Sequence, residues 1–213
     1  MKKVKHISFD LDGTLINSFP IMRQAWGETM LELGLAVGFD SYKKYIGIPF
    51  HNIINNLSLS GIKNEIEILY FSKTKKLSNQ VKLTDNAREI LFWCKKTGFS
   101  TSIITSKPRK NAELIIFEKK LEVDILICGD DLKAFKPHPD PGLKILDKFN
   151  LNANNILYIG DMIFDLQFAQ NLGAHFIHFN NYEENTLPSN LVNNVHTISN
   201  LIEIKQLITL PLK

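Results

Sequence analysis

The chain has 213 residues, 44% of them hydrophobic and 22% charged, a composition typical of a globular protein with a substantial core. Its formal net charge of +3 is small, and its lysines and arginines form no basic stripe, which argues against nucleic acid as a partner. No apolar run reaches the length of a membrane span, and the one near the N-terminus is too short for a signal peptide, so we expect a cytoplasmic protein that contacts no membrane.

The first predicted element is a strand over residues 3–10, an apolar run that ends on acidic residues. Apolar residues at helical spacing then predict a series of helices, with Ser18 as the N-cap and Pro20 in the first turn of the first helix. These helices cover residues 19–34, 49–57 and 63–77. No strand is predicted before residue 99, so residues 17–83 form a predicted all-helical insertion.

From residue 84 onward predicted helices and strands alternate, which is typical of parallel β-α-β units in a doubly wound sheet. The predicted strands cover residues 99–105, 124–128, 156–159, 175–179 and 195–198. The predicted helices cover residues 84–96, 108–120, 141–149, 164–172 and 201–208. The helical insertion therefore interrupts an α/β fold directly after its first strand. Ligands of such sheets bind at the carboxyl ends of the strands, so the insertion is expected to lie over the site as a lid.

Four motifs place polar or charged residues just after predicted strands. They are Asp10-Leu11-Asp12-Gly13-Thr14, Thr105-Ser106, Lys136 in a proline-flanked loop, and Gly160-Asp161 with Asp165 four residues later. Each motif alone has a common structural explanation, such as solvated acids or a surface lysine in a turn. Parallel strands end at one edge of a sheet, so we expect the four motifs to converge.

The converging residues would supply the parts of phosphoryl transfer through an aspartyl-phosphate, namely a carboxylate nucleophile, a proton-transfer acid, phosphate donors, a cation and a metal ligand. The hydroxyl of Thr105 can donate to phosphate oxygens, and the ammonium of Lys136 can offset crowded negative charge. Asp161 can join Asp10 in holding Mg²⁺. For Asp165 two roles stay open, compensation of a helix dipole or a part in the site through Lys136 or a metal-bound water.

In this order the four motifs resemble those of the haloacid dehalogenase superfamily. The segment that starts at Lys136-Pro137-His138-Pro139, together with the helical insertion, resembles the phosphoglycolate phosphatase-like branch with a small helical (C1-type) cap. The resemblance implies a Rossmann-like α/β core, made of residues 1–16 and 84–213, and a mobile cap of residues 17–83.

The resemblance also implies roles for single residues. Asp10 would be the nucleophile and Asp12 the general acid and base, while Mg²⁺ would be held by Asp10, the backbone carbonyl of Asp12, and Asp161. The residues expected to bind the phosphoryl group are Gly13, Thr105, Ser106 and Lys136. Two positions depart from the pattern and leave the substrate open, because Asn17 replaces an acid and Ser106 stands where relatives often have asparagine.

The resulting prediction is an Mg²⁺-dependent phosphatase that hydrolyses a small phosphorylated metabolite, as a monomer or weak homodimer. A halide leaving group needs no acid, so Asp12 argues against a dehalogenase. A β-phosphoglucomutase-like mutase shares the same parts and is the alternative enzyme. A phosphate-sensing module without catalysis would be expected to lack Asp10, Lys136 or Asp161. Substrate choice is expected in the insertion, where residues 45–49 either face the site or only connect two helices.

Overall fold

The computed structural model describes residues 3–184 and 187–209. Six parallel strands form one sheet in the order β5-β4-β1-β6-β7-β8. The strands are β1 (His6–Phe9), β4 (Ser100–Thr105), β5 (Ile125–Cys128), β6 (Ile156–Gly160), β7 (His175–Phe179) and β8 (Thr197–Ile198). The predicted α/β fold class is confirmed.

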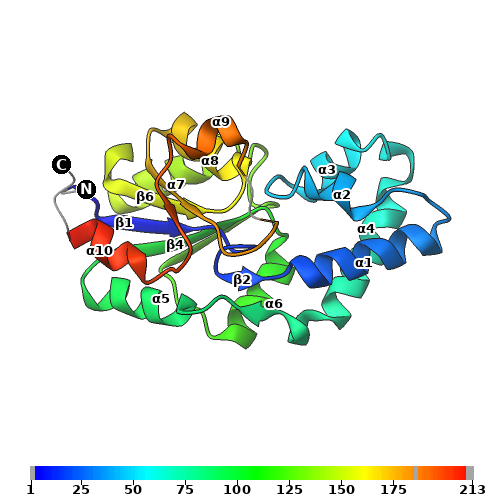
Figure 1. Ribbon diagram of the computed structural model, residues 1–213, viewed down its shortest axis with the longest axis horizontal. Helices are drawn as coiled ribbons and strands as arrows, with labels where there is room; N and C mark the ends of the chain where they lie inside the picture. Colours follow the sequence, from blue (N-terminus) through cyan, green and yellow to red (C-terminus); the bar gives the residue numbers. More distant parts are fainter. Residues whose placement is uncertain (1–2, 185–186, 210–213) are drawn as a thin grey trace.

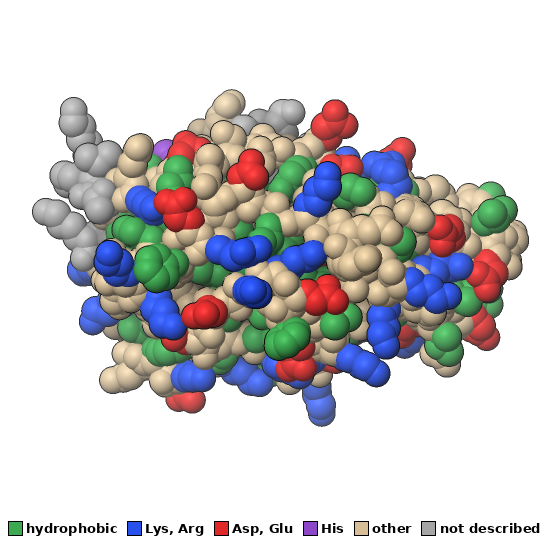
Figure 2. Space-filling view, turned by 90° about the horizontal axis from the view of Figure 1, so that it is seen from below, with side chains coloured by type: hydrophobic (Ala, Val, Ile, Leu, Met, Phe, Trp, Pro, Cys, Tyr) green, Lys and Arg blue, Asp and Glu red, His purple; other side chains and the backbone are tan. Residues whose placement is uncertain are grey.

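Helices cover both faces of the sheet (Figure 1). One face carries α5 (Ala87–Lys96), α6 (Arg109–Lys119) and α10 (Glu203–Thr209), and the other carries α7 (Asp140–Phe149), α8 (Ile163–Leu172) and α9 (Ser189–Val192). Successive residues of a strand point to opposite faces, so Ile103 packs in the cluster under α5 while the adjacent Ile104 packs under α7 and α8. Figure 2 views the molecule from the α5 and α6 side, where basic and acidic side chains are interspersed rather than gathered in a stripe.

The helical insertion leaves the sheet between β1 and β4 and stands beside it (Figure 1). It contains α1 (Phe19–Glu32), α2 (Phe39–Lys43), α3 (Phe50–Asn56) and α4 (Lys63–Lys76), with short 3-10 turns at Ser60–Ile62 and Ser78–Gln80. Its buried aromatic residues form a hydrophobic cluster of their own, in which Trp26 stacks on Tyr42 with ring centroids 4.5 Å apart. This cluster is distinct from the two clusters on the sheet, but it also includes Met162, which lies between β6 and α8.

Several predicted boundaries were wrong for local reasons. The insertion is not purely helical at its base, because β2 (Ile16–Asn17) pairs antiparallel with β3 (Lys82–Leu83). Strands of two residues are too short to show an alternating pattern. Helix α5 begins at Ala87 rather than at residue 84, since Asn86 takes a left-handed conformation with φ of 63°. Short α2 and α9 were not predicted, and the predicted strand over residues 195–198 is only Thr197–Ile198.

The sheet order brings the predicted motifs to one edge. Strand β1 lies between β4 and β6, with Phe9 in register with Ile103 on one side and Ile159 on the other. The residues that follow these positions are therefore neighbours at the carboxyl edge of the sheet, beneath the helical insertion. In the part of the chain that the structure describes, no helix is long and apolar enough to cross a membrane.

Candidate active site

Three carboxylates meet at the carboxyl edge of the sheet. Asp10 follows β1, Asp161 follows β6, and Asp165 lies in the first turn of α8. One oxygen atom from each lies within 4.8 Å of the other two, and all three residues are buried. Such a concentration of buried negative charge needs cations to offset it.

The ammonium of Lys136 lies among these acids and is itself 1% exposed. Its Nζ donates to Asp10 Oδ1 at 2.6 Å, to Asp165 Oδ1 at 2.8 Å and to the Tyr158 hydroxyl at 3.1 Å. Burial alone would lower the pKa of Lys136, but the charges of Asp10 and Asp165 raise it above its ordinary value. The side chain is therefore a fixed cation at neutral pH.

Every contact of the Asp165 carboxylate is with a hydrogen-bond donor. Its Oδ1 accepts from Lys136 Nζ and from the Tyr158 hydroxyl, the latter at 3.0 Å. Its Oδ2 accepts from the backbone N–H groups of Asp161 at 3.1 Å and Met162 at 3.0 Å. Asp165 thus connects Lys136 to the turn that carries Asp161. This contact corresponds to the role through Lys136 that the sequence left open.

The other two acids of the cluster, Asp10 and Asp161, have raised pKa values. Burial raises the pKa of Asp10 to about 7, although Lys136 opposes the rise. Burial, reinforced by Asp165 and Asp10, raises the pKa of Asp161 well above its usual range. Asp161 Oδ1 accepts a hydrogen bond from Thr14 Oγ1 at 3.0 Å, whereas its Oδ2 is buried without a hydrogen-bond partner among the described residues. The donor set therefore fits a hard divalent cation, which would take up this oxygen and offset the excess charge.

Asp12 is not part of the cluster of three acids, although it lines the same cavity as Asp10. Its Oδ2 forms an ion pair with Lys107 Nζ at 3.1 Å, and its Oδ1 is buried without a hydrogen-bond partner in the described part of the chain. The next residue, Gly13, has a φ of +86°. A Cβ at Gly13 would lie 2.2 Å from Asp161 Oδ2, so a glycine is required where the two motifs touch.

The second motif connects the sheet to the helical insertion. Thr105 is buried, and its Oγ1 accepts a hydrogen bond from the backbone N–H of Lys107 at 3.2 Å. Ser106, which the sequence assigned to phosphate binding, donates its hydroxyl proton to the backbone carbonyl of Gly47. The loop after β4 is thereby bonded directly to residues 45–49 of the insertion.

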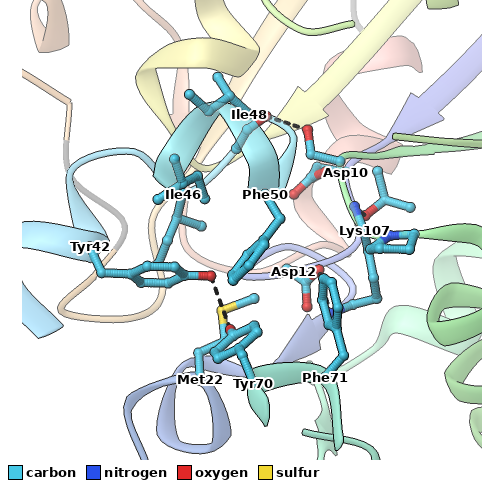
Figure 3. A pocket seen from close by; sticks show the side chains of 15 residues that line it. Asp10, Asp12, Met22, Tyr42, Ile46, Ile48, Phe50, Tyr70, Phe71 and Lys107 are labelled. Atoms are coloured by element: carbon cyan, nitrogen blue, oxygen red, sulfur yellow. Dashed lines mark hydrogen bonds and ion pairs between the residues drawn. The ribbon is translucent and has the colours of Figure 1, made fainter. Parts of the chain in front are cut away.

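A cavity separates the acidic edge of the sheet from the helical insertion (Figure 3). Asp10 and Asp12 line it on one side, and the hydroxyl groups of Tyr42 and Tyr70 meet at 3.0 Å on the other. Residues 46–48 line it as well, so the 45–49 segment faces the site and is more than a connector.

Some residues at the site were not predicted from the sequence. Tyr158 lies in an apolar strand and reads as a core residue, and the aromatic residues of the insertion read as helix packing. Thr14 belongs to the first motif but was given no role, and Lys107 directly follows the second motif, which was the available signal for both. Asn17, the neutral replacement for an acid, lies in β2 and is absent from the cavity lining.

Comparison with known proteins agrees with this arrangement. The family described as haloacid dehalogenase-like hydrolase matches residues 7–179. A phosphoglycolate phosphatase from Pseudomonas savastanoi is 29% identical over 186 residues, covering 81% of this chain and 68% of that protein. A pyrophosphatase PpaX from Bacillus mycoides is 26% identical over 179 residues, covering 81% of each chain. The crystal structure of a hydrolase from Pseudomonas syringae has the same fold, with a TM-score of 0.84 at 20% identity over 96% of this chain and 97% of that chain.

Proposed function

Because this chain belongs to the haloacid dehalogenase-like hydrolases, we propose that it is a phosphatase that cleaves a small phosphate monoester through an aspartyl-phosphate. The observation that carries the proposal is the convergence of Asp10, Asp161 and Asp165 around the ammonium of Lys136. The names of the phosphoglycolate phosphatase and pyrophosphatase relatives support the same class of reaction.

In the proposed reaction a carboxylate oxygen of Asp10 attacks the phosphorus atom, and Asp12 protonates the departing alcohol oxygen. Asp12, now a carboxylate, then removes a proton from a water molecule that attacks the aspartyl-phosphate. Inorganic phosphate leaves, and Asp10 is regenerated. Lys136 holds Asp10 in place at 2.6 Å and offsets the repulsion between an anionic nucleophile and an anionic ester.

A divalent cation, which we propose is Mg²⁺, fits beside these groups. Asp10, Asp161 and the backbone carbonyl of Asp12 would hold it, and the unpartnered Oδ2 of Asp161 is the observation that favours a ligand there. When bound, the cation supplies electrostatic stabilisation of the phosphoryl oxygens. Thr105, Ser106 and Gly13 are the further residues that we propose contact the phosphoryl group.

We propose that the helical insertion, residues 17–83, moves as a cap over a core of residues 1–16 and 84–213. The cavity between them has a volume of about 50 Å³, small beside the roughly 300 Å³ or more of pockets that enclose drug-sized ligands. In this proposal the insertion moves outward when substrate enters, and the Ser106–Gly47 hydrogen bond breaks. Closure would exclude water before the attack by Asp10.

Turnover of p-nitrophenyl phosphate with Mg²⁺ tests the proposal. Asp10→Asn is expected to abolish phosphate release and Asp12→Asn nearly to abolish it, while the exposed helix residue Asp147 provides the matched control Asp147→Asn. EDTA should remove the activity and Mg²⁺ should restore it. Undiminished rates in either site variant would refute the role assigned to that residue. Formation of an isomer from glucose 1-phosphate and a bisphosphate primer, without free phosphate, would instead indicate the mutase.

A further inference from the structure

The wall that the helical insertion contributes to the cavity is apolar. Met22, Ile48, Phe50 and Phe71 are among the side chains that form it, and Figure 3 shows them facing the acidic side. Among the described residues that line the cavity, Lys107 is the sole cationic side chain. The leaving group of a bound ester would lie against this wall, because Asp10 and Asp12 occupy the opposite side.

Two basic residues of the insertion are engaged in ion pairs away from the cavity. The Arg23 guanidinium donates to Glu184 at 3.2 Å and lies over the ring of Phe39, and Lys73 pairs with Glu32 at 2.7 Å. Lys107 belongs to the core, in the loop after β4, where its Nζ lies 3.1 Å from Asp12 Oδ2. Among the described residues that the insertion contributes to the lining there is no cation, so a second anionic group on a substrate would meet none along this wall.

The polar atoms of the wall are suited to an uncharged group. Tyr42 donates to Tyr70 at 3.0 Å, and burial raises the pKa of both phenols, so both stay neutral. A pair of hydroxyl groups uses one proton in the bond between them, which leaves the second proton available for a neutral acceptor on a ligand. Burying a carboxylate or phosphate here without a cation would cost far more than burying an uncharged group.

Building on the proposed function, we infer that the substrate is the phosphate monoester of a small, uncharged alcohol with an apolar or aromatic surface. Esters that carry a carboxylate or a second phosphate in the leaving group are then poor substrates. This distinguishes the chain from the activities named for its phosphoglycolate phosphatase and pyrophosphatase relatives.

Two matched pairs of esters test the inference, each differing only in a carboxylate against its amide. The pairs are 2-phosphoglycolate with carbamoylmethyl phosphate, and 4-carboxyphenyl phosphate with 4-carbamoylphenyl phosphate. We expect kcat/KM for phosphate release to favour the amide by about tenfold or more in both pairs. Equal rates, or faster turnover of the carboxylates, would overturn the inference and leave the phosphatase intact. If the enzyme released no phosphate from any of the four esters and none from p-nitrophenyl phosphate, the proposed function would fail and this inference with it.

A positive charge introduced into the wall should weaken or remove the preference. Phe71→Lys places a cation at the cavity and is expected to lower the amide-to-carboxylate ratio by about tenfold. Ile68→Lys adds the same charge on the same helix, α4, at a side chain that is 70% exposed, and should leave the ratio unchanged. A ratio that moves equally in both variants would overturn the assignment of this wall. The wild-type ratios test the inference even if Phe71→Lys does not fold.

Discussion

Replacing Asp165 with asparagine is a sharp test of the site, because the four groups that contact its carboxylate all donate hydrogen bonds. Asparagine has nearly the same shape but carries one oxygen and one NH₂ group. Whichever way the amide is oriented, its NH₂ group therefore faces two of the four hydrogen-bond donors. The Tyr158 hydroxyl can rotate and accept instead, whereas the ammonium of Lys136 and the backbone N–H groups of Asp161 and Met162 cannot.

The least costly orientation places the NH₂ group of the new side chain toward Lys136 and Tyr158. It removes one buried hydrogen bond to a charged group, which is worth roughly 1.5–3 kcal/mol. Relief of repulsion works in the opposite direction, because Asp165 is one of the charges that raise the pKa of Asp10 and Asp161. We expect Asp165→Asn to lower the free energy of unfolding by about 2 kcal/mol. The loosened Lys136 should lower kcat by about 100-fold.

Urea unfolding followed by circular dichroism, in EDTA at pH 7.5, measures the stability without a contribution from bound metal. Asp147→Asn removes the same charge from an exposed helix position and should change the free energy of unfolding by less than about 0.5 kcal/mol. If Asp165→Asn unfolded within that same margin of the wild type, the account of Asp165 as a buried acceptor of four donors would be wrong.

Two further changes test the packing around the site and the pH dependence of the sheet. Gly13→Ala should lower the free energy of unfolding by about 1–3 kcal/mol and remove most of the metal-stimulated activity, because the new Cβ would displace Asp161. The control Gly38→Ala should change little, because a Cβ at Gly38 would have no atom within 4 Å. Burial lowers the pKa of His6 to about 4, so below pH 6.5 the unfolded chain takes up a proton that the folded chain refuses. Stability should therefore fall by about 2 kcal/mol between pH 7 and pH 5 on account of this residue. His6→Gln should lose correspondingly less in urea titrations at the two pH values, and equal losses would refute the assignment.

The sequence predicted the sheet well, because each strand is a short apolar run that ends on a turn or a motif. Asp10, Thr105 and Asp161 were placed at one edge by the rule that parallel strands end together. The role of Asp165 was not decidable, since a helix acid four residues after a motif reads the same whether it faces solvent or a buried lysine. Only the fold showed that α8 turns it toward Lys136.

Other features depend on contacts between distant segments, which local pattern does not encode. Tyr158 lies in an apolar strand, yet its hydroxyl bonds to Lys136 from 22 positions away. Likewise, helical spacing predicted that Tyr70 packs, and it does, but its hydroxyl group also faces the cavity together with that of Tyr42, which lies in the unpredicted α2. The base of the insertion was missed because β2 and β3 have two residues each.

The pairing of β2 with β3 has a mechanical consequence. Both passages of the chain between sheet and insertion run through this one short ribbon, where Ile16 stands opposite Leu83 and Asn17 opposite Lys82. In the movement proposed for the insertion, these two attachments, paired with each other, would act as a single pivot and favour swinging over sliding or twisting. The substrate entrance would then open most at the side farthest from the β2–β3 ribbon.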